Sequence, residues 1–215
     1  MMKSKNLSLL LSVAFAFVLS ACSQLALPGK EKPAPVAEKV AENAELKAIS
    51  DSAKSLPSFI YQTANQTYTA YFSGKNIVYI DVSGNKVEKI YLKNGQVIAV
   101  ANNTKLYDFN VANADVDALQ VKRNAESWVK KLSYNSADKN IGAVRTGEEA
   151  KLNYLCIAKV QQVAGTKRVL RTSGNSAGST SRLTAKMRLN GNQFYQMDCI
   201  LSGDRVAKLS LIANK

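Results

Sequence analysis

The sequence has 215 residues, with 29 Lys or Arg against 16 Asp or Glu and no His, which gives a formal net charge of +13 at pH 7. Without histidine the chain lacks both the usual general base of a hydrolase triad and a common zinc ligand. An apolar content of 46% allows a real hydrophobic core, and the length suits one domain, or two small ones that share a sheet.

The first 21 residues show the three parts of a secretory signal. Lys3 and Lys5 form a basic beginning, residues 7–19 are an uncharged apolar run, and Ser20 and Ala21 provide the small residues that precede a cleavage point. The apolar run is too short for a transmembrane helix, which needs about 20 residues. Residues 1–21 therefore predict a signal peptide.

The run Leu19-Ser20-Ala21-Cys22 resembles the lipobox of bacterial lipoproteins. The resemblance implies that Cys22 carries diacylglycerol and a further acyl chain such as palmitate, and that it becomes the first residue of the mature protein. Three acyl chains would anchor the protein in a membrane effectively permanently. Ser23, in place of an Asp, implies the outer membrane, on its periplasmic or its surface face. An uncleaved anchor and a secreted protein with a chance cysteine remain as alternatives.

Residues 22–35 contain prolines and charges but few side chains to bury, which predicts a flexible tether after the lipidated cysteine. Residues 36–58 form the next segment. Apolar residues recur there at helical spacing, opposite a charged face, and Pro57 ends the pattern. We expect a helix over residues 36–56.

Residues 59–134 predict an antiparallel β-meander followed by a helix. Turn sequences recur about every ten residues between short segments rich in Tyr, Val and Ile, and include Ser73-Gly74 and Asn94-Gly95. The helix covers residues 115–132, with Asp115 as its cap and an apolar stripe that includes Val116, Leu119 and Trp128. We expect this helix to cover one face of the meander.

Residues 135–215 predict a polar connection and a second β-rich region, without sequence repetition of the first. Cys156 and Cys199 remain after Cys22 is lipidated, and export to an oxidising compartment favours a disulfide between them. Period-two patterns around both cysteines predict that each lies on the apolar face of a strand. The fold class is therefore α+β, dominated by antiparallel β-meanders, with an N-terminal helix, a central packing helix and a Cys156–Cys199 disulfide.

Basic residues concentrate in the C-terminal part. Residues 145–215 hold twelve basic and four acidic side chains, and no Asp or Glu occurs between residues 150 and 197. If Arg171 pairs with Arg182 across a hairpin, Lys167 faces Lys186, and such like-charge pairs repel one another. The sequence predicts an anion-binding surface formed by the following five residues: Lys167, Arg171, Arg182, Lys186 and Arg188. The alternative is a solvated face that keeps an edge strand from aggregating.

Catalytic patterns in the chain are weak. Residues 174–178 match the GxSxG pattern, but that motif needs a strand–turn–helix context and a histidine base. Their flanks instead predict a flexible Gly/Ser loop. The chain has no CxxC pair and no phosphate-binding glycine loop. We expect no enzyme activity, no cofactor and no metal.

The sequence therefore favours a non-enzymatic envelope lipoprotein that presents a basic β domain to an anionic polymer, to lipid headgroups or to an envelope protein. Nucleic acid is not an expected partner for a protein tethered in the envelope. One alternative is an inhibitor of a cell-wall hydrolase, because the plan resembles that of disulfide-bonded lysozyme-inhibitor lipoproteins. Another is an accessory lipoprotein of an outer-membrane complex, which would dock a partner through Tyr71, Tyr79 and Tyr91.

Overall fold

The structure, a computed structural model, describes residues 43–110, 116–134 and 148–214. The chain divides into two units, residues 1–36 and 37–215, and every element described below belongs to the second. The predicted signal peptide, Cys22, the predicted tether and the predicted cap Asp115 all lie outside the described residues. The second unit holds every described strand and helix together with both ends of the disulfide, and so contains a complete core.

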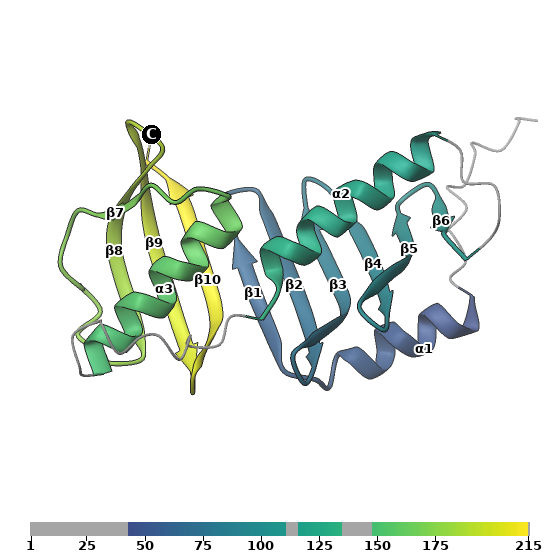
Figure 1. The fold of residues 1–215 in the computed structure, drawn as a ribbon, viewed down its shortest axis with the longest axis horizontal. Helices are drawn as coiled ribbons and strands as arrows, with labels where there is room; N and C mark the ends of the chain where they lie inside the picture. The colour runs from purple at the N-terminus through teal and green to yellow at the C-terminus, as the bar shows by residue number, and fades with distance from the viewer. Residues whose placement is uncertain (1–42, 111–115, 135–147, 215) are drawn as a thin grey trace, which may run out of the picture. The chain divides into compact units, whose positions relative to one another are not determined.

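Ten strands form one sheet, in the order β6-β5-β4-β3-β2-β1-β10-β9-β8-β7 (Figure 1). Neighbouring strands pair antiparallel except at the centre, where β1 and β10 run parallel. The predicted α+β class, with a predominantly antiparallel sheet, is confirmed. The strands are β1 (Ser58–Gln62), β2 (Gln66–Ser73), β3 (Asn76–Gly84), β4 (Glu88–Lys93), β5 (Gln96–Asn102), β6 (Leu106–Asp108), β7 (Val169–Arg171), β8 (Arg182–Leu189), β9 (Gln193–Ser202) and β10 (Arg205–Ala213).

Apart from the longer connection between β7 and β8, short turns join the strands of each half in sequence order, as the turn residues predict. Between β4 and β5, Asn94 and Gly95 adopt φ angles of 54° and 77°. A two-residue hairpin turn with the twist of the flanking strands needs such left-handed conformations, which Asn and Gly adopt at least cost. The β8–β9 turn has three residues, and two of them, Asn190 and Gly191, also adopt left-handed φ angles of 35° and 83°.

Three helices pack on the two faces of the sheet. α2 (Val116–Leu132) and α3 (Glu148–Ala164) share one hydrophobic cluster with apolar side chains from both halves of the sheet. α1 (Ala44–Ala53) packs on the opposite face against β3 and β4. Of the helix predicted over residues 36–56, the structure confirms Ala44–Ala53. Asn43 is its extended N-cap residue and accepts from Leu46 N–H, so the helix begins later than predicted. It ends at Ala53, earlier than predicted, because the residue before a proline disfavours helical geometry and the chain turns before Pro57.

The prediction of a strand around Cys156 is wrong, because this segment forms the helix α3. Its buried side chains recur at spacings of three and four residues, which is the period of a helix. The period-two interpretation grouped Cys156 with Tyr154 and Ala158, but both of these are only half-buried. The fully or almost fully buried residues are Leu152, Leu155, Cys156, Lys159, Val160 and Val163.

The predicted disulfide is confirmed. The sulfur atoms of Cys156 and Cys199 are bonded at 2.02 Å, with Cα atoms 6.0 Å apart. Both half-cystines are fully buried, and Cys199 lies on the apolar face of β9 beside Met197, as predicted. The bond therefore fixes α3 to the middle of the second half of the sheet.

Two of the three tyrosines through which the accessory lipoprotein would dock a partner are covered, and the third, Tyr71, is half-buried. Tyr79 and Tyr91 are 2% and 0% exposed and pack with Leu46 and Ala53 of α1. α1 provides this cover, while α2 packs on the other face of the sheet. Tyr71 stacks on Tyr79, with ring centroids 5.7 Å apart.

α2 covers one face of the sheet as predicted, although its apolar stripe is shorter than expected. Trp128 stacks on Tyr68 of β2, with ring centroids 4.0 Å apart, which confirms its role as a packing residue. Val116 and Leu119, both placed in the stripe by the sequence, are 78% and 47% exposed. The first turn of α2 buries only Ala118, so the central and C-terminal turns provide most of its contribution to the core.

Lys159 is buried where the two halves of the sheet meet, and its side chain is 2% exposed. The ammonium lies 4.1 Å from the ring centroid of Phe59 in β1 and donates to the carbonyl oxygen of Ser133 at 2.6 Å. It also approaches the carbonyl oxygen of Leu132 at 3.4 Å. These carbonyl groups lie at the C-terminal end of α2, which favours a cation. Burial nevertheless lowers the pKa of Lys159 to about 7.

We predict that Lys159 makes folding stability depend on pH. The unfolded lysine keeps a pKa near 10.5, so between pH 7 and pH 10 the unfolded state binds more protons than the folded state. Stability therefore rises with pH in this range, by about 2 kcal/mol between pH 7.5 and pH 9.5. Urea unfolding of the wild type and of Lys159→Met should show this slope only in the wild type. Parallel pH profiles for the two proteins would contradict the prediction.

We also predict that the disulfide contributes about 4 kcal/mol, the chain-entropy value for a loop of this length. The bonded residues are 43 positions apart. The double variant Cys156→Ala/Cys199→Ala should lose roughly this free energy of unfolding and should become insensitive to reductant. The reduced wild type serves as the control, and a double variant as stable as the oxidised wild type would disprove the estimate.

Candidate anion-binding site

The predicted alternation along β8 is confirmed. Leu183, Ala185, Met187 and Leu189 are buried towards α3, while the basic side chains of the strand point to the opposite face. α1 packs on that opposite face over β3 and β4, at some distance along the sheet from β8. The basic side chains of β8 therefore lie on a part of the sheet that is not covered by α1.

The predicted register of the basic hairpin is wrong. Arg171 is paired with Met187, and Leu170 with Arg188, so Arg171 does not face Arg182 and Lys167 does not face Lys186. The prediction placed residues 172–181 in a loop that connects Arg171 directly to a paired Arg182. These residues instead continue along the edge of β8 after β7 ends, so β7 pairs with the opposite end of β8.

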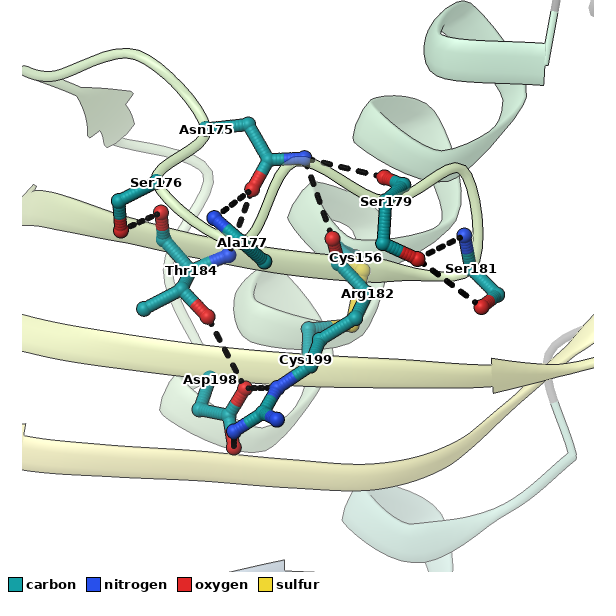
Figure 2. Close-up of polar contacts among 10 residues, drawn as sticks. All are labelled: Cys156, Asn175, Ser176, Ala177, Ser179, Ser181, Arg182, Thr184, Asp198 and Cys199. Carbon is teal, nitrogen blue, oxygen red and sulfur yellow. Dashed lines mark hydrogen bonds and ion pairs between the residues drawn. A yellow bond between two sulfur atoms is a disulfide. The ribbon is translucent and has the colours of Figure 1, made fainter.

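The Gly/Ser-rich segment of residues 172–181 is bound along the edge of β8 rather than free as predicted. Thr172 N–H donates to the carbonyl oxygen of Lys186 at 2.8 Å, and Ser176 N–H donates to that of Thr184 at 2.9 Å. The amide of Asn175 replaces a strand partner: its Oδ1 accepts from Thr184 N–H, and its Nδ2 donates to the carbonyl oxygen of Arg182 (Figure 2). The segment satisfies backbone groups that an open edge strand would expose.

Asp198 of β9 neutralises Arg182. The guanidinium donates from Nε to Oδ1 at 2.7 Å and from Nη2 to Oδ2 at 3.0 Å, and Thr184 Oγ1 contacts Oδ1 at 3.2 Å (Figure 2). Hydrogen bonding to Asp198 and its charge raise the pKa of Arg182. Burial alone would raise the pKa of Asp198, but the hydrogen bond and charge of Arg182 lower it. Arg182 therefore belongs to a local ion pair rather than to an anion site.

Arg171 also has a structural partner. Its Nη1 donates to Oδ1 of Asn153 in α3 at 2.9 Å, so the side chain turns towards the helix and joins β7 to it. Two of the five residues predicted to bind an anion thus stabilise the fold, and Lys167, Lys186 and Arg188 remain.

Lys167 and Arg188 come together at a hollow of about 260 Å³ beside the turn that follows β8. Arg168, which is not among the five predicted residues, lines the same hollow, and none of the eight residues that line the hollow is acidic. We call it the β7–β8 hollow. Asn190 fixes its wall: its N–H donates to the carbonyl oxygen of Arg168 at 3.4 Å, and its Oδ1 accepts from Thr166 Oγ1 at 2.9 Å. Only the true register of β7 brings Arg168 to this place.

Three basic side chains around one hollow can donate several charge-assisted hydrogen bonds to a phosphate, sulfate or carboxylate group. Arginine can do so through two parallel N–H groups, while lysine acts as a mobile point charge. Lys186 lies on the same face of β8, two residues before Arg188, and is exposed. None of Lys167, Arg168, Lys186 and Arg188 forms a salt bridge with another residue in the described part of the chain.

The described ranges contain no cluster of three or more His, Cys, Asp or Glu side chains that could hold a metal ion. Among the helices in residues 43–110, 116–134 and 148–214, none has the length and apolar character needed to cross a membrane.

No family model matches the chain, and no solved structure matches it. A search of curated proteins finds similarity to an uncharacterized protein of Pasteurella multocida (strain Pm70), PM0674. The two are 38% identical over 216 residues, which cover 92% of this chain and 94% of the Pasteurella protein. Similarity of this level over nearly the full length of both chains shows common descent, and the chain belongs to the same family as this Pasteurella multocida protein.

Proposed function

We propose that the protein is a lipid-anchored, non-enzymatic component of the bacterial outer membrane, and that its β domain binds an anionic component of the envelope. The β7–β8 hollow is the observation that carries this proposal. Lys167, Arg168 and Arg188 converge there without an acidic lining residue. Like charges are gathered against their mutual repulsion, and an anion would relieve it.

The proposed compartment is supported by the N-terminal sequence and by the sulfur chemistry. The signal-like residues 1–21 end in the lipobox-like run before Cys22. The remaining cysteines form a buried disulfide, a bond that is favoured in exported proteins. Inhibition of a basic lysozyme is a less suitable function for this site, because a basic hollow would repel such an enzyme.

We predict that Cys22 carries the membrane anchor. Cys22→Ser should abolish incorporation of labelled palmitate and move the protein from the detergent-rich to the aqueous phase in detergent partition, because each buried methylene of an acyl chain adds about 0.8 kcal/mol of membrane affinity. Cys156→Ala/Cys199→Ala is the control and should still take up label. Labelling that persists in Cys22→Ser would disprove the proposed anchor.

We predict that Arg188 contributes to anion binding and that Arg182 contributes much less. A soluble form that begins at Ser23 retains the whole unit of residues 37–215 and can be bound to phosphocellulose. Arg188→Gln should weaken binding about two- to five-fold, the effect of one exposed charge, and should elute at lower salt. Arg182→Gln removes the same charge but from a side chain that Asp198 already neutralises.

The comparison of these two variants separates a local site from general basicity. If Arg182→Gln and Arg188→Gln elute together, well below the wild type, net charge and not the β7–β8 hollow determines binding. If neither variant differs from the wild type, the proposed site is wrong.

A further inference from the structure

A row of three side chains crosses the sheet beside the β7–β8 hollow. Leu170 of β7 is paired with Arg188 of β8, and Arg188 is paired with Phe194 of β9. Residues paired directly across antiparallel strands lie on the same face, so the arginine has one apolar side chain on either side. Leu170 is 52% exposed and Phe194 is 44% exposed.

Both apolar side chains are unusually exposed to solvent. Of the large hydrophobic side chains in the described ranges, only five are at least 40% exposed, and two of the five flank the same arginine. Leu170 also lines the β7–β8 hollow, next to Lys167 and Arg168. Phe194 and Lys186 are among the residues that line a second, shallower depression of about 810 Å³. Basic and apolar groups therefore alternate over one continuous patch.

We propose that this patch binds the surface of a membrane that contains anionic phospholipid. The inference rests on the proposed function and names the anionic component. Cationic side chains complement lipid phosphates, while exposed Leu and Phe side chains can enter the boundary between headgroups and acyl chains. A hydrophilic polymer such as an acidic polysaccharide would match the charges but would leave Leu170 and Phe194 without a partner.

The two kinds of side chain have separable roles. Lys167, Arg168, Lys186 and Arg188 attract the domain to the anionic surface, an effect that salt screens. Leu170 and Phe194 are removed from water only when the patch reaches the membrane, and this contribution does not depend on salt. The proposed lipid anchor at Cys22 keeps a membrane close to the domain, so even weak contacts of the patch would be occupied.

The test uses the soluble form that begins at Ser23 and sedimentation with vesicles. The vesicles contain phosphatidylethanolamine with phosphatidylglycerol, or phosphatidylcholine alone. We expect binding to the anionic vesicles only. Lys186→Gln/Arg188→Gln should lower this affinity about 25-fold, because each cation contributes roughly five-fold. Leu170→Ser/Phe194→Ser should lower it about ten-fold, because two partly exposed apolar side chains lose their burial.

Matched variants control for charge, hydrophobicity and folding. Lys75→Gln/Lys130→Gln removes two exposed cations elsewhere, and Val87→Ser/Val116→Ser removes two exposed apolar groups elsewhere. Both should bind anionic vesicles like the wild type. All variants should keep the thermal unfolding midpoint of the wild type within a few degrees, as expected for exposed positions.

Retention on phosphocellulose and binding of soluble polygalacturonate distinguish the two proposals. We expect Leu170→Ser/Phe194→Ser to keep wild-type retention on phosphocellulose and to lose affinity only for vesicles. If this variant binds vesicles like the wild type, or if the wild type prefers polygalacturonate, the membrane inference is overturned while anion binding stands. If the wild type binds none of the phosphate matrix, the vesicles and the polysaccharide, both proposals fail.

Discussion

The parallel pairing of β1 with β10 is the constraint on which the rest of the domain depends. Each half of the sheet is built from hairpins between strands that are neighbours in sequence, but β1 and β10 lie at opposite ends of the described chain. Their contact is short, with Ile60 opposite Lys208 and Gln62 opposite Ser210. Arg205 supplements it by donating to the carbonyl oxygen of Ser58 at 2.9 Å. The two halves become one sheet only when this long-range contact forms.

The helices reinforce the same junction from one side. Lys159 of α3 joins the end of α2 to Phe59 of β1, and Gln162 of α3 donates to the carbonyl oxygen of Lys130 at 2.8 Å. The disulfide fixes α3 to β9, and Arg171 fixes β7 to α3. Through these contacts the central junction and the far edge of the sheet belong to one connected structure, so the position of the β7–β8 hollow depends on α3.

Local signals in the sequence predicted the local parts of the fold. Asn-Gly and Ser-Gly turns located the hairpins because those turns require left-handed backbone that few residues adopt. The disulfide was predicted from the oxidising compartment and not from the geometry of strands. The prediction is therefore correct although Cys156 lies in a helix and not in the predicted strand. A short segment with apolar residues at both two- and four-residue spacings fits a strand or a helix, and tertiary packing decided for α3.

The site was harder to predict because it depends on register. A shift in the pairing of β7 with β8 moved Arg168 into the site and Arg171 out of it, and sequence spacing contains no information on that shift when the connection is long. The burial of Lys159 was not predicted, for a related reason. A lysine among apolar residues looks like an exposed position in a strand, and only the carbonyl groups at the end of α2 make its burial tolerable.

The repulsion expected among the basic residues is resolved mostly within the domain. Asp198 neutralises Arg182, Asp204 pairs with Lys151, and Asn153 binds Arg171, so cations that are close in sequence have different environments. Lys167, Arg168, Lys186 and Arg188 form no salt bridge with a described residue and lie towards one end of β8, where Leu170 and Phe194 are exposed. A surface kept basic only for solubility needs no such neighbours, because exposed apolar groups oppose solubility. The combination is better explained by a partner that carries negative charge above an apolar layer.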